Sequence, residues 1–267
     1  MVRSLLDTDM PAVREMAARD WDRIAPDYFG HIVSPLEVGI PRALLRALDG
    51  IADAGSKTVA DLGCGIGTLL PELAARFGRV LAIDFSSVML TRARASCRAR
   101  HVTFHRGDLA DLRAFAGRVD VAVAVNSVLT PDAARLDRIF TGLRTVLAPG
   151  GVLLSVFPAM EAILYQGFLI HERERRRHAA PRARMRTSRI LERAKYDFVH
   201  GTYRDADHAQ KFFYDFELAH RLRRAGFRRI RLSRLPYPWD DGLGGYERFP
   251  GEPPMWDWIV RAVAPSA

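Results

Sequence analysis

Short apolar runs alternate with helical patterns between residues 58 and 157. The apolar runs predict five strands, at residues 58–62, 80–84, 102–105, 119–125 and 152–157. Between them, apolar residues recur every three or four positions, which predicts amphipathic helices at residues 68–77, 86–98 and 131–147. Strands that alternate with helices are typical of βαβ units. We therefore predict an α/β fold with a doubly wound parallel sheet.

The pattern changes after Pro158. Residues 159–213 contain an aromatic-bearing helix, an Arg-rich run and two predicted short strands, at 196–200 and 211–214, and we interpret this segment as an insertion. A helical stripe at 216–225, a strand at 227–235 and a closing strand at 255–263 follow it. The chain thus returns to the sheet after the insertion.

Composition agrees with one globular domain. The chain has 267 residues, 48% of them apolar, which is enough for a full hydrophobic core. No apolar stretch approaches the roughly 18 to 20 residues of a membrane-spanning helix, and residues 1–10 lack the pattern of a secretory signal. We expect a soluble, cytoplasmic protein without a metal site, whose Cys64 and Cys97 are reduced thiols.

The formal net charge of +9 raises the question of a polyanionic partner. Only Lys57, Lys195 and Lys211 are lysines, and an arginine-rich composition often reflects a GC-rich genome. The denser basic runs, 173–186 and 221–234, are either binding patches or solvated faces. We do not expect a nucleic acid as partner.

A glycine-rich turn follows the first predicted strand, at residues 61–67. Such a turn presents free backbone N–H groups and the positive end of a helix dipole to a ligand. Dinucleotide enzymes place glycines at i, i+2 and i+5, whereas here they stand at 63, 65 and 67, and Asp61 precedes them. A buried carboxylate at this place suits an ammonium group, which S-adenosylmethionine has and NAD lacks.

Motifs at the ends of the next three strands and before the fifth strand agree with this interpretation. They are Ala-Ile-Asp-Phe-Ser at 82–86, Arg-Gly-Asp-Leu at 106–109, Val-Ala-Val-Asn-Ser at 123–127 and Leu-Ala-Pro-Gly-Gly at 147–151. With the glycine turn they resemble class I S-adenosylmethionine-dependent methyltransferases over residues 21–157.

This resemblance implies roles for residues at the strand ends. Asp84 would bind the ribose hydroxyls and Phe85 would pack beside the adenine. Asp108 and Leu109 would contact the adenine, and Asn126 and Ser127 would lie near the methyl group. The full set that the resemblance implies for the cofactor is Tyr28, Asp61, Gly63, Cys64, Gly65, Gly67, Asp84, Phe85, Met89, Asp108, Leu109, Asn126 and Ser127.

The resemblance also implies the architecture. A Rossmann-like, seven-stranded, mostly parallel sheet would have the strand order 3-2-1-4-5-7-6. Residues 1–50 would form a helical lid, 51–158 the cofactor-binding core, 159–213 a substrate cover, and 214–267 would complete the sheet.

The substrate half of the pocket has weaker signals. Residues 21–28 resemble the lead-in of small-molecule methyltransferases related to quinone-biosynthesis enzymes, which makes Tyr28 a contact of cofactor or substrate. The candidate pocket residues are Tyr28, His31, Tyr165, Phe168, Tyr203 and Phe213. The candidate general bases are His31, His171 and His200, because a phenol or alcohol acceptor benefits from a base.

We expect methyl transfer from S-adenosylmethionine, with S-adenosylhomocysteine as product, to an oxygen or nitrogen atom of a small aromatic or heterocyclic metabolite. An RNA or protein methyltransferase stays open as an alternative, although residues 126–129 lack the Asn/Asp-Pro-Pro-aromatic motif of enzymes that methylate base or amide nitrogens. A cofactor-binding partner protein without catalysis is also open, and so is a homodimer.

Overall fold

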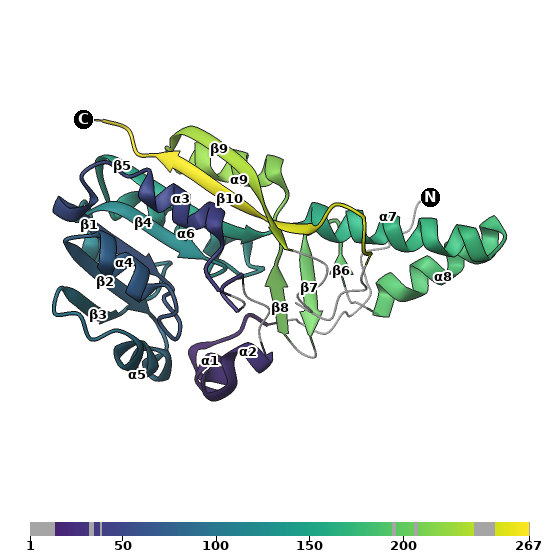
Figure 1. Ribbon diagram of the computed structural model, residues 1–267, viewed down its shortest axis with the longest axis horizontal. Helices are drawn as coiled ribbons and strands as arrows, with labels where there is room; N and C mark the ends of the chain where they lie inside the picture. The colour runs from purple at the N-terminus through teal and green to yellow at the C-terminus, as the bar shows by residue number, and fades with distance from the viewer. Residues whose placement is uncertain are drawn as a thin grey trace, which may run out of the picture.

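The computed structural model describes residues 14–31, 35–37, 39–193, 196–205, 208–237 and 249–266. At its centre lies a seven-stranded sheet with the strand order β3-β2-β1-β4-β5-β10-β9 (Figure 1). Its strands are β1 (Thr58–Leu62), β2 (Arg79–Asp84), β3 (Val102–Arg106), β4 (Val119–Val125), β5 (Leu147–Pro158), β9 (Arg228–Tyr237) and β10 (Met255–Val263). Strands β1 to β5 are parallel, and β10 runs antiparallel to β5 and β9. The predicted fold and strand order are confirmed, with β9 and β10 as the sixth and seventh strands.

Helices cover both faces of this sheet. Helices α3 (Arg42–Asp49), α4 (Leu70–Arg76) and α5 (Ser87–Ser96) pack on one face, and α6 (Ala133–Thr145), α9 (Asp215–Arg224) and the start of α7 (Met160–Arg177) pack on the other. Residues of β4 alternate between the two hydrophobic clusters, with Val121 and Val123 in one and Ala122 and Ala124 in the other. This alternation explains why the whole strand is apolar.

Side-chain caps set the starts of two helices beside the site. Ser86 Oγ accepts a hydrogen bond from Met89 N at 3.0 Å, so α5 begins at Ser87. Asp132 accepts from Arg135 N, so α6 begins at Ala133, two residues later than predicted. Both caps satisfy backbone N–H groups that the first turn leaves free. Short 3-10 turns lie at Ala25–Asp27, Ala54–Ser56 and Arg113–Phe115.

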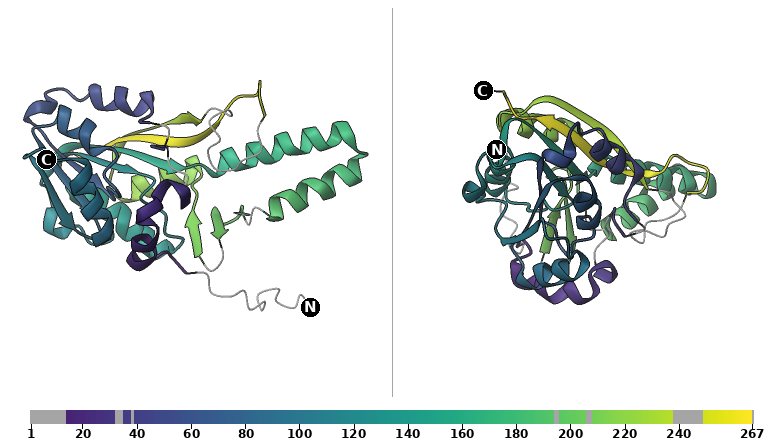
Figure 2. Two further views of the ribbon diagram at one scale, coloured as in Figure 1. Left: turned by 60° about the horizontal axis from the view of Figure 1, so that its bottom comes forward. Right: turned by 60° about the vertical axis from the view of Figure 1, so that its left-hand side comes forward.

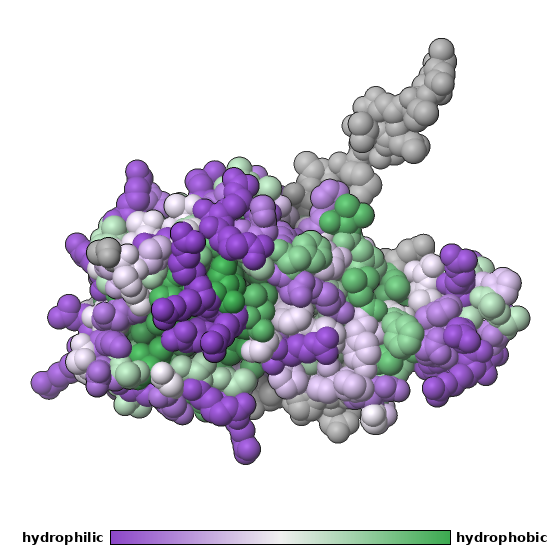
Figure 3. All heavy atoms as spheres, turned by 90° about the horizontal axis from the view of Figure 1, so that it is seen from above, coloured by the Kyte–Doolittle hydropathy of each residue, from purple (hydrophilic) through white to green (hydrophobic). Residues whose placement is uncertain are grey.

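The insertion begins with a hairpin of two long helices. Helices α7 and α8 (Ala180–Arg193) pack side by side and extend away from the sheet, at the end opposite β3 (Figures 1 and 2). The far end of the hairpin is mainly hydrophilic, as the right-hand end of Figure 3 shows. Helix α8 was not predicted, because Pro181 reads as a break. In the first turn of a helix, however, the missing N–H of proline has no partner to lose.

A three-stranded antiparallel sheet follows, with the order β6-β7-β8. Its strands are β6 (Tyr196–Asp197), β7 (Thr202–Asp205) and β8 (His208–Lys211). The predicted strand at 196–200 is wrong beyond Asp197, whose carboxylate accepts hydrogen bonds from the N–H groups of Val199 and His200 and turns the chain. Of the strand predicted at 211–214, only Lys211 lies in a strand, at the end of β8. Phe213 returns to the main sheet, where its N–H donates to Pro158 O and its carbonyl accepts from Met160 N.

The N-terminal helices α1 (Ala18–Ile24) and α2 (Tyr28–His31) lie beside α5. Ile24 and Ala25 pack on Met89, and Arg92 donates to the carbonyl of Ala25. Ser86 Oγ donates to the Asp22 carboxylate. These contacts hold the segment near the carboxyl ends of the central strands. Within the part of the chain that the structure describes, no helix is both long and apolar enough to span a membrane.

Candidate functional site

The turn after β1 has a backbone that neighbouring groups can approach closely. Gly63, Gly65 and Gly67 have φ values of 75°, 53° and 83°, a region that side chains other than glycine rarely adopt. The N–H groups of Gly63 and Cys64 donate to Ile83 O at 2.8 and 3.1 Å. A Cβ on Gly63 would lie 2.4 Å from Ser127 Cβ. At Gly63 the turn therefore packs directly on the segment that follows β4, with no room for a side chain.

Two buried carboxylates flank this turn. Asp84 Oδ2 accepts from Gly65 N at 2.9 Å, and its Oδ1 accepts from Ser86 N at 2.9 Å. Burial raises the pKa of Asp84. Burial, with the neighbouring charge of Asp84, also raises the pKa of Asp61 to about 7. A cation bound here would stabilise both ionised carboxylates.

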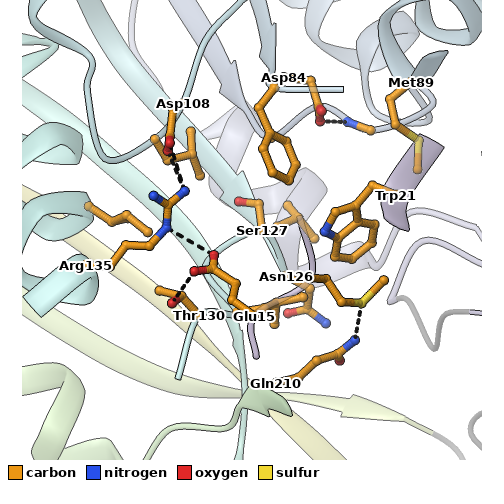
Figure 4. A pocket seen from close by; sticks show the side chains of 18 of the residues that line it. Glu15, Trp21, Asp84, Met89, Asp108, Asn126, Ser127, Thr130, Arg135 and Gln210 are labelled. Carbon is orange, nitrogen blue, oxygen red and sulfur yellow. Dashed lines mark hydrogen bonds and ion pairs between the residues drawn. The ribbon is translucent and has the colours of Figure 1, made fainter. Parts of the chain in front are cut away.

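The larger cavity at these strand ends has a volume of about 820 Å³, including its open mouth. Residues from the strand ends line it together with residues from the N-terminal segment, α6 and β8. They are Glu15, Met16, Trp21, Tyr28, Gly63, Gly65, Asp84, Phe85, Met89, Gly107, Asp108, Leu109, Val125, Asn126, Ser127, Leu129, Thr130, Arg135, Ile139, Ala209 and Gln210. Figure 4 shows Asp84 and Asp108 on one side, and Glu15, Asn126 and Gln210 on the other.

A smaller cavity of about 380 Å³ adjoins the larger one at the glycine turn. Asp61, Cys64 and Leu69 are among its lining residues, and it shares Tyr28, Gly63, Gly65 and Val125 with the larger cavity. Burial raises the pKa of the Cys64 thiol, so the thiol stays protonated. Burial and the Asp84 charge raise the pKa of Tyr28 to about 12. The two cavities together form an elongated site around the turn.

An arginine on α6 joins three parts of the site. The Arg135 guanidinium donates to both oxygens of Asp108, at 2.8 and 2.9 Å, and to Glu15 Oε1 at 3.1 Å. Thr130 Oγ1 donates to Glu15 Oε2 at 2.9 Å. The chain Asp108–Arg135–Glu15–Thr130 therefore ties the N-terminal segment to the strand ends (Figure 4).

The N-terminal segment is also fixed from its other side. Ala209 of β8 donates its N–H to Arg14 O at 3.1 Å, and Lys211 N donates to Leu129 O at 2.8 Å. The Arg14 guanidinium binds Asp20 and holds the pKa of that buried carboxyl well below its usual range. The insertion thus contributes β8 to the cavity wall, beside the loop that follows β4.

Asn126, the first residue after β4, adopts φ 45°. Its Nδ2 donates to Asp257 Oδ2 at 2.9 Å, and the Tyr237 hydroxyl donates to the same oxygen. Burial raises the pKa of Asp257 to about 6. The two antiparallel strands, β9 and β10, thereby reach the end of β4 through side chains.

The structure brings most of the predicted cofactor residues together. Twelve of the thirteen line one cavity or both, and Gly67 lines neither. Gly67 packs against α5, where an added Cβ would lie 2.8 Å from Ala93 Cα. Its small size serves the packing of the turn on that helix.

Of the predicted substrate residues whose side chains the structure describes, only Tyr28 lines the cavities. Phe213 is fully buried between Phe140 and Phe157, and Tyr165 packs on Trp256. Phe168 is exposed on α7, and Tyr203 packs with Tyr196 and Phe212. An aromatic residue can line a pocket or pack in the core, and the aromatic content of the sequence did not show which role each position has.

The two candidate bases whose side chains are described, His171 and His200, also lie elsewhere. His171 Nδ1 is 3.1 Å from Thr187 Oγ1, between α7 and α8. His200 is exposed and binds Asp197 at 2.9 Å, and the side chain of His31 lies outside the described part of the chain. Within the described residues, neither cavity is lined by a histidine.

Sequence reasoning missed Glu15, Met16, Trp21, Thr130, Arg135, Ala209 and Gln210, which line the larger cavity. Arg135 stands in an ordinary helical pattern, and Gln210 lies in a strand whose register the sequence did not fix. A signal was available only for Trp21, at the start of the lead-in segment.

Residues 59–151, from β1 into β5, match the family model for the methyltransferase domain. Together with the strand order, this match supports a class I S-adenosylmethionine-dependent methyltransferase domain over these residues, with S-adenosylmethionine as its cofactor.

Three proteins illustrate what this chain is similar to. The trans-aconitate 2-methyltransferase of Deinococcus radiodurans is 39% identical over 106 residues, which are 38% of this chain and 38% of that protein. The chain therefore matches well under half the length of this relative. A second similar protein is a solved structure that concerns the conversion of a disulfide bond into a thioacetal group during echinomycin biosynthesis. It has a TM-score of 0.61 and 18% identity to this chain, and the match covers 93% of each chain. Magnesium protoporphyrin IX methyltransferase from Synechocystis PCC 6803, with bound S-adenosylmethionine, has a TM-score of 0.52 and 15% identity, and the match covers 83% of this chain and 76% of that one. At these identities the two structures support the fold alone.

Proposed function

We propose that the protein transfers the methyl group of S-adenosylmethionine to a nitrogen or oxygen atom of a small, flat acceptor that is neutral or cationic. The observation that carries the proposal is the larger cavity. Its walls combine the apolar side chains of Met16, Trp21 and Leu129 with three carboxylates and one guanidinium. Flat apolar walls suit an aromatic or heterocyclic ring.

The charge of the lining argues against a polyanionic acceptor. Arg135 is already paired with Asp108 and Glu15, so its charge is compensated within the protein. Trans-aconitate, the acceptor in the name of the Deinococcus relative, carries three carboxylates. Three carboxylates and one guanidinium leave the cavity lining with a net negative charge, which would repel such an acceptor. We therefore propose a different acceptor for this chain.

We propose that the cofactor lies across the glycine turn. Asp84 would accept from the ribose hydroxyls, and Asp108 and Leu109 would contact the adenine. Asp61 would face the ammonium group from the smaller cavity. Asn126 and Ser127 would lie next to the methyl group. In this arrangement residues 1–50 act as a lid, 51–158 hold the cofactor, 159–213 cover the acceptor and 214–267 complete the sheet.

Methyl transfer is an in-line displacement. The bond between carbon and sulfur breaks as the acceptor atom binds the carbon, and the positive charge leaves the sulfur. The protein's task is therefore alignment and exclusion of water. Because no described histidine lines the cavities, an acceptor that needs no base before transfer, such as a neutral amine, is favoured.

Calorimetry with S-adenosylhomocysteine, S-adenosylmethionine and NAD tests the cofactor assignment. We expect the first two to bind and NAD not to bind. Asp84→Ala should weaken binding of S-adenosylhomocysteine at least about tenfold, because two hydrogen bonds to a charged group are lost. Asp111→Asn, on an exposed pair with Arg113, is the matched control and should leave affinity unchanged. Binding of NAD alone, or equal affinity in Asp84→Ala, would refute the assignment.

Transfer of labelled methyl groups tests the acceptor class. Wild-type protein is incubated with labelled S-adenosylmethionine and pools of small amines, phenols and carboxylates, and in parallel with RNA and protein. We expect label in amine or phenol pools. Label only in RNA would favour the alternative enzyme, for which the arginine-rich α7–α8 hairpin is the supporting observation. Tight cofactor binding without transfer to any pool would favour a non-catalytic partner protein.

A further inference from the structure

Arg135 of α6 lies between two carboxylates from different parts of the chain. Its Nη2 donates to both oxygens of Asp108, at 2.8 and 2.9 Å, and its Nε donates to Glu15 Oε1 at 3.1 Å (Figure 4). Asp108 lies in the loop after β3, whereas Glu15 belongs to the N-terminal segment, residues 14–31. Because the two carboxylates bind different nitrogens of one guanidinium, both pairs hold at the same time.

The contacts of these two carboxylates are tied together. The guanidinium is planar and rigid, so it fixes the orientation of one carboxylate relative to the other. Asp108 Oδ1 also accepts from Ala110 N at 2.9 Å, and Glu15 Oε2 accepts from the hydroxyl of the buried Thr130 at 2.9 Å. The side chain of Arg135 is only 24% exposed, so its pairs are better shielded from water than surface ion pairs. A shift of one carboxylate would therefore disturb the hydrogen bonds of the other.

Asp108 has room for a ligand beside Arg135. Both residues line the larger cavity, where Asp108 is proposed to accept a hydrogen bond from the amino group of the adenine. In the described part of the chain, Asp108 Oδ2 accepts one hydrogen bond, from Arg135, and a carboxylate oxygen can accept two. The side chain of Asp108 is 42% exposed, so a carboxylate without Arg135 could turn towards water.

A second contact joins the N-terminal segment to Asp84, the acid proposed for the ribose. Ser86 N donates to Asp84 Oδ1 at 2.9 Å, and Ser86 Oγ donates to the carboxylate of Asp22. The segment is therefore linked to both acids of the nucleoside site, through one intermediate residue each. Of the two intermediates, Arg135 carries a full charge and holds a carboxylate on both sides.

We propose that Arg135 is a positioning residue that couples recognition of the adenine amino group at Asp108 to the docking of residues 14–31 through Glu15. The inference rests on the proposed function and adds to it a link between the adenine and the segment that walls the cavity. A hydrogen bond from the amino group holds Asp108 in place. Arg135 then stays aligned with Glu15, and the segment opens less often.

Two ligands that differ only in the amino group test the adenine side. They are S-adenosylhomocysteine and its analogue with purine in place of adenine, and calorimetry measures both affinities. We expect wild type to bind S-adenosylhomocysteine about tenfold more tightly, as one hydrogen bond to a charged group implies. Arg135→Met should bring the two affinities close to equal, and Arg135→Lys should keep part of the preference. Arg138→Met, at an exposed position of the same helix, is the matched control and should keep all of it.

Hydrogen exchange of the backbone amides of residues 14–31 tests the other side of the link. With both ligands at saturation, S-adenosylhomocysteine should slow exchange in wild type more than the purine analogue does. In Arg135→Met the two ligands should protect the segment equally. Glu15→Gln should also remove this difference and lower the preference for the amino group, because coupling between two sites is reciprocal.

A double variant separates positioning from direct contact. In the background of Asp108→Ala, which lacks the carboxylate, Arg135→Met should cause no further change in the affinity ratio of the two ligands. A further change would show that Arg135 acts on the ligand without Asp108, and the inference would be wrong. Thermal melting checks that each variant folds, and Glu15→Gln and Arg135→Lys decide the matter if Arg135→Met does not.

Three other results would overturn the inference. A preference that rises in Arg135→Met would show that Arg135 competes with the adenine for Asp108. An unchanged preference in this variant, or equal protection of residues 14–31 by both ligands in wild type, would show that there is no coupling. If wild type binds S-adenosylhomocysteine without any preference over the analogue, the cofactor assignment stands and only the role of Arg135 fails. If wild type binds neither ligand, the proposed function fails as well.

Discussion

The buried carboxyl of Asp61 should make the stability of the ligand-free protein depend on pH. In the folded chain, burial and the Asp84 charge raise the pKa of Asp61 from 3.8 to about 7. In the unfolded chain the same carboxyl ionises near its ordinary value. Between these two pKa values, the folded state therefore keeps a proton on Asp61 that the unfolded state has lost.

The sign and size follow from this difference. Asp61 contributes no penalty below its unfolded pKa, where it is protonated in both states. As the pH rises, the unfolded state gains an ionised carboxylate that the folded state cannot yet form, and stability falls until the pH passes about 7. A shift of about three pKa units corresponds to about 4 kcal/mol. Asp61→Asn does not titrate and should lack this loss.

Urea unfolding of wild type and Asp61→Asn between pH 4 and pH 8, followed by tryptophan fluorescence, measures the effect. The free energy of unfolding of wild type relative to Asp61→Asn should fall by about 4 kcal/mol over this range. Other titrating groups cancel in the difference when they do not touch Asp61. Asp84→Asn in the wild-type background should make the free energy of unfolding depend less on pH, because it removes the negative charge beside Asp61.

A difference that stays constant with pH would refute the reasoning. It would show that the folded protein ionises Asp61 as easily as the unfolded chain does. Saturating S-adenosylhomocysteine adds a further check, since an ammonium group beside Asp61 should lower its pKa and reduce the slope. An unchanged slope would argue against Asp61 as the ammonium partner.

Three more changes test the packing around the site. Gly67→Ala should lower the free energy of unfolding in urea by about 3 kcal/mol through strain and overpacking, because its Cβ would lie 2.4 Å from Ser96 Oγ. The Cβ of Gly65→Ala would meet no atom within 4 Å, so this control variant should lose only about 1 kcal/mol. Equal losses in the two variants would contradict the reasoning. Glu174→Gln breaks the pairs with Arg173 and Arg186 and should speed tryptic cleavage of the α7–α8 hairpin several-fold, while Glu172→Gln, on a partly exposed pair, should not. Asp20→Asn should be less stable than wild type at pH 7, and the difference should shrink steadily as the pH falls below 3.8. Arg14 holds the pKa of Asp20 in the folded chain well below 3.8, so the contribution of this carboxyl is lost only as the folded protein takes up the proton. A difference that stays constant in acid would point to packing instead.

The sequence determined the sheet and the strand ends that carry the predicted cofactor residues. Apolar runs separated by amphipathic helices fix the parallel strands, because each strand must be buried on both faces, as β4 is. Asp61 and Asp84 lie at the ends of β1 and β2, and Asn126 directly follows β4. Once the strand order is known, Asp61, Asp84 and Asn126 must meet at one edge. Local pattern was therefore sufficient for this half.

Only the tertiary structure decided the other half. Glu15, Arg135 and Gln210 come from three elements far apart in the chain, and each has an ordinary local pattern. The aromatic residues of the insertion were predicted to line the pocket. Phe213 instead lies in the main core, because its backbone forms hydrogen bonds with Pro158 and Met160. The orientation of the Asn126 amide depends on Asp257, 131 positions away. Such contacts join surfaces that meet only after the helices have packed on the sheet, so no short-range pattern records them.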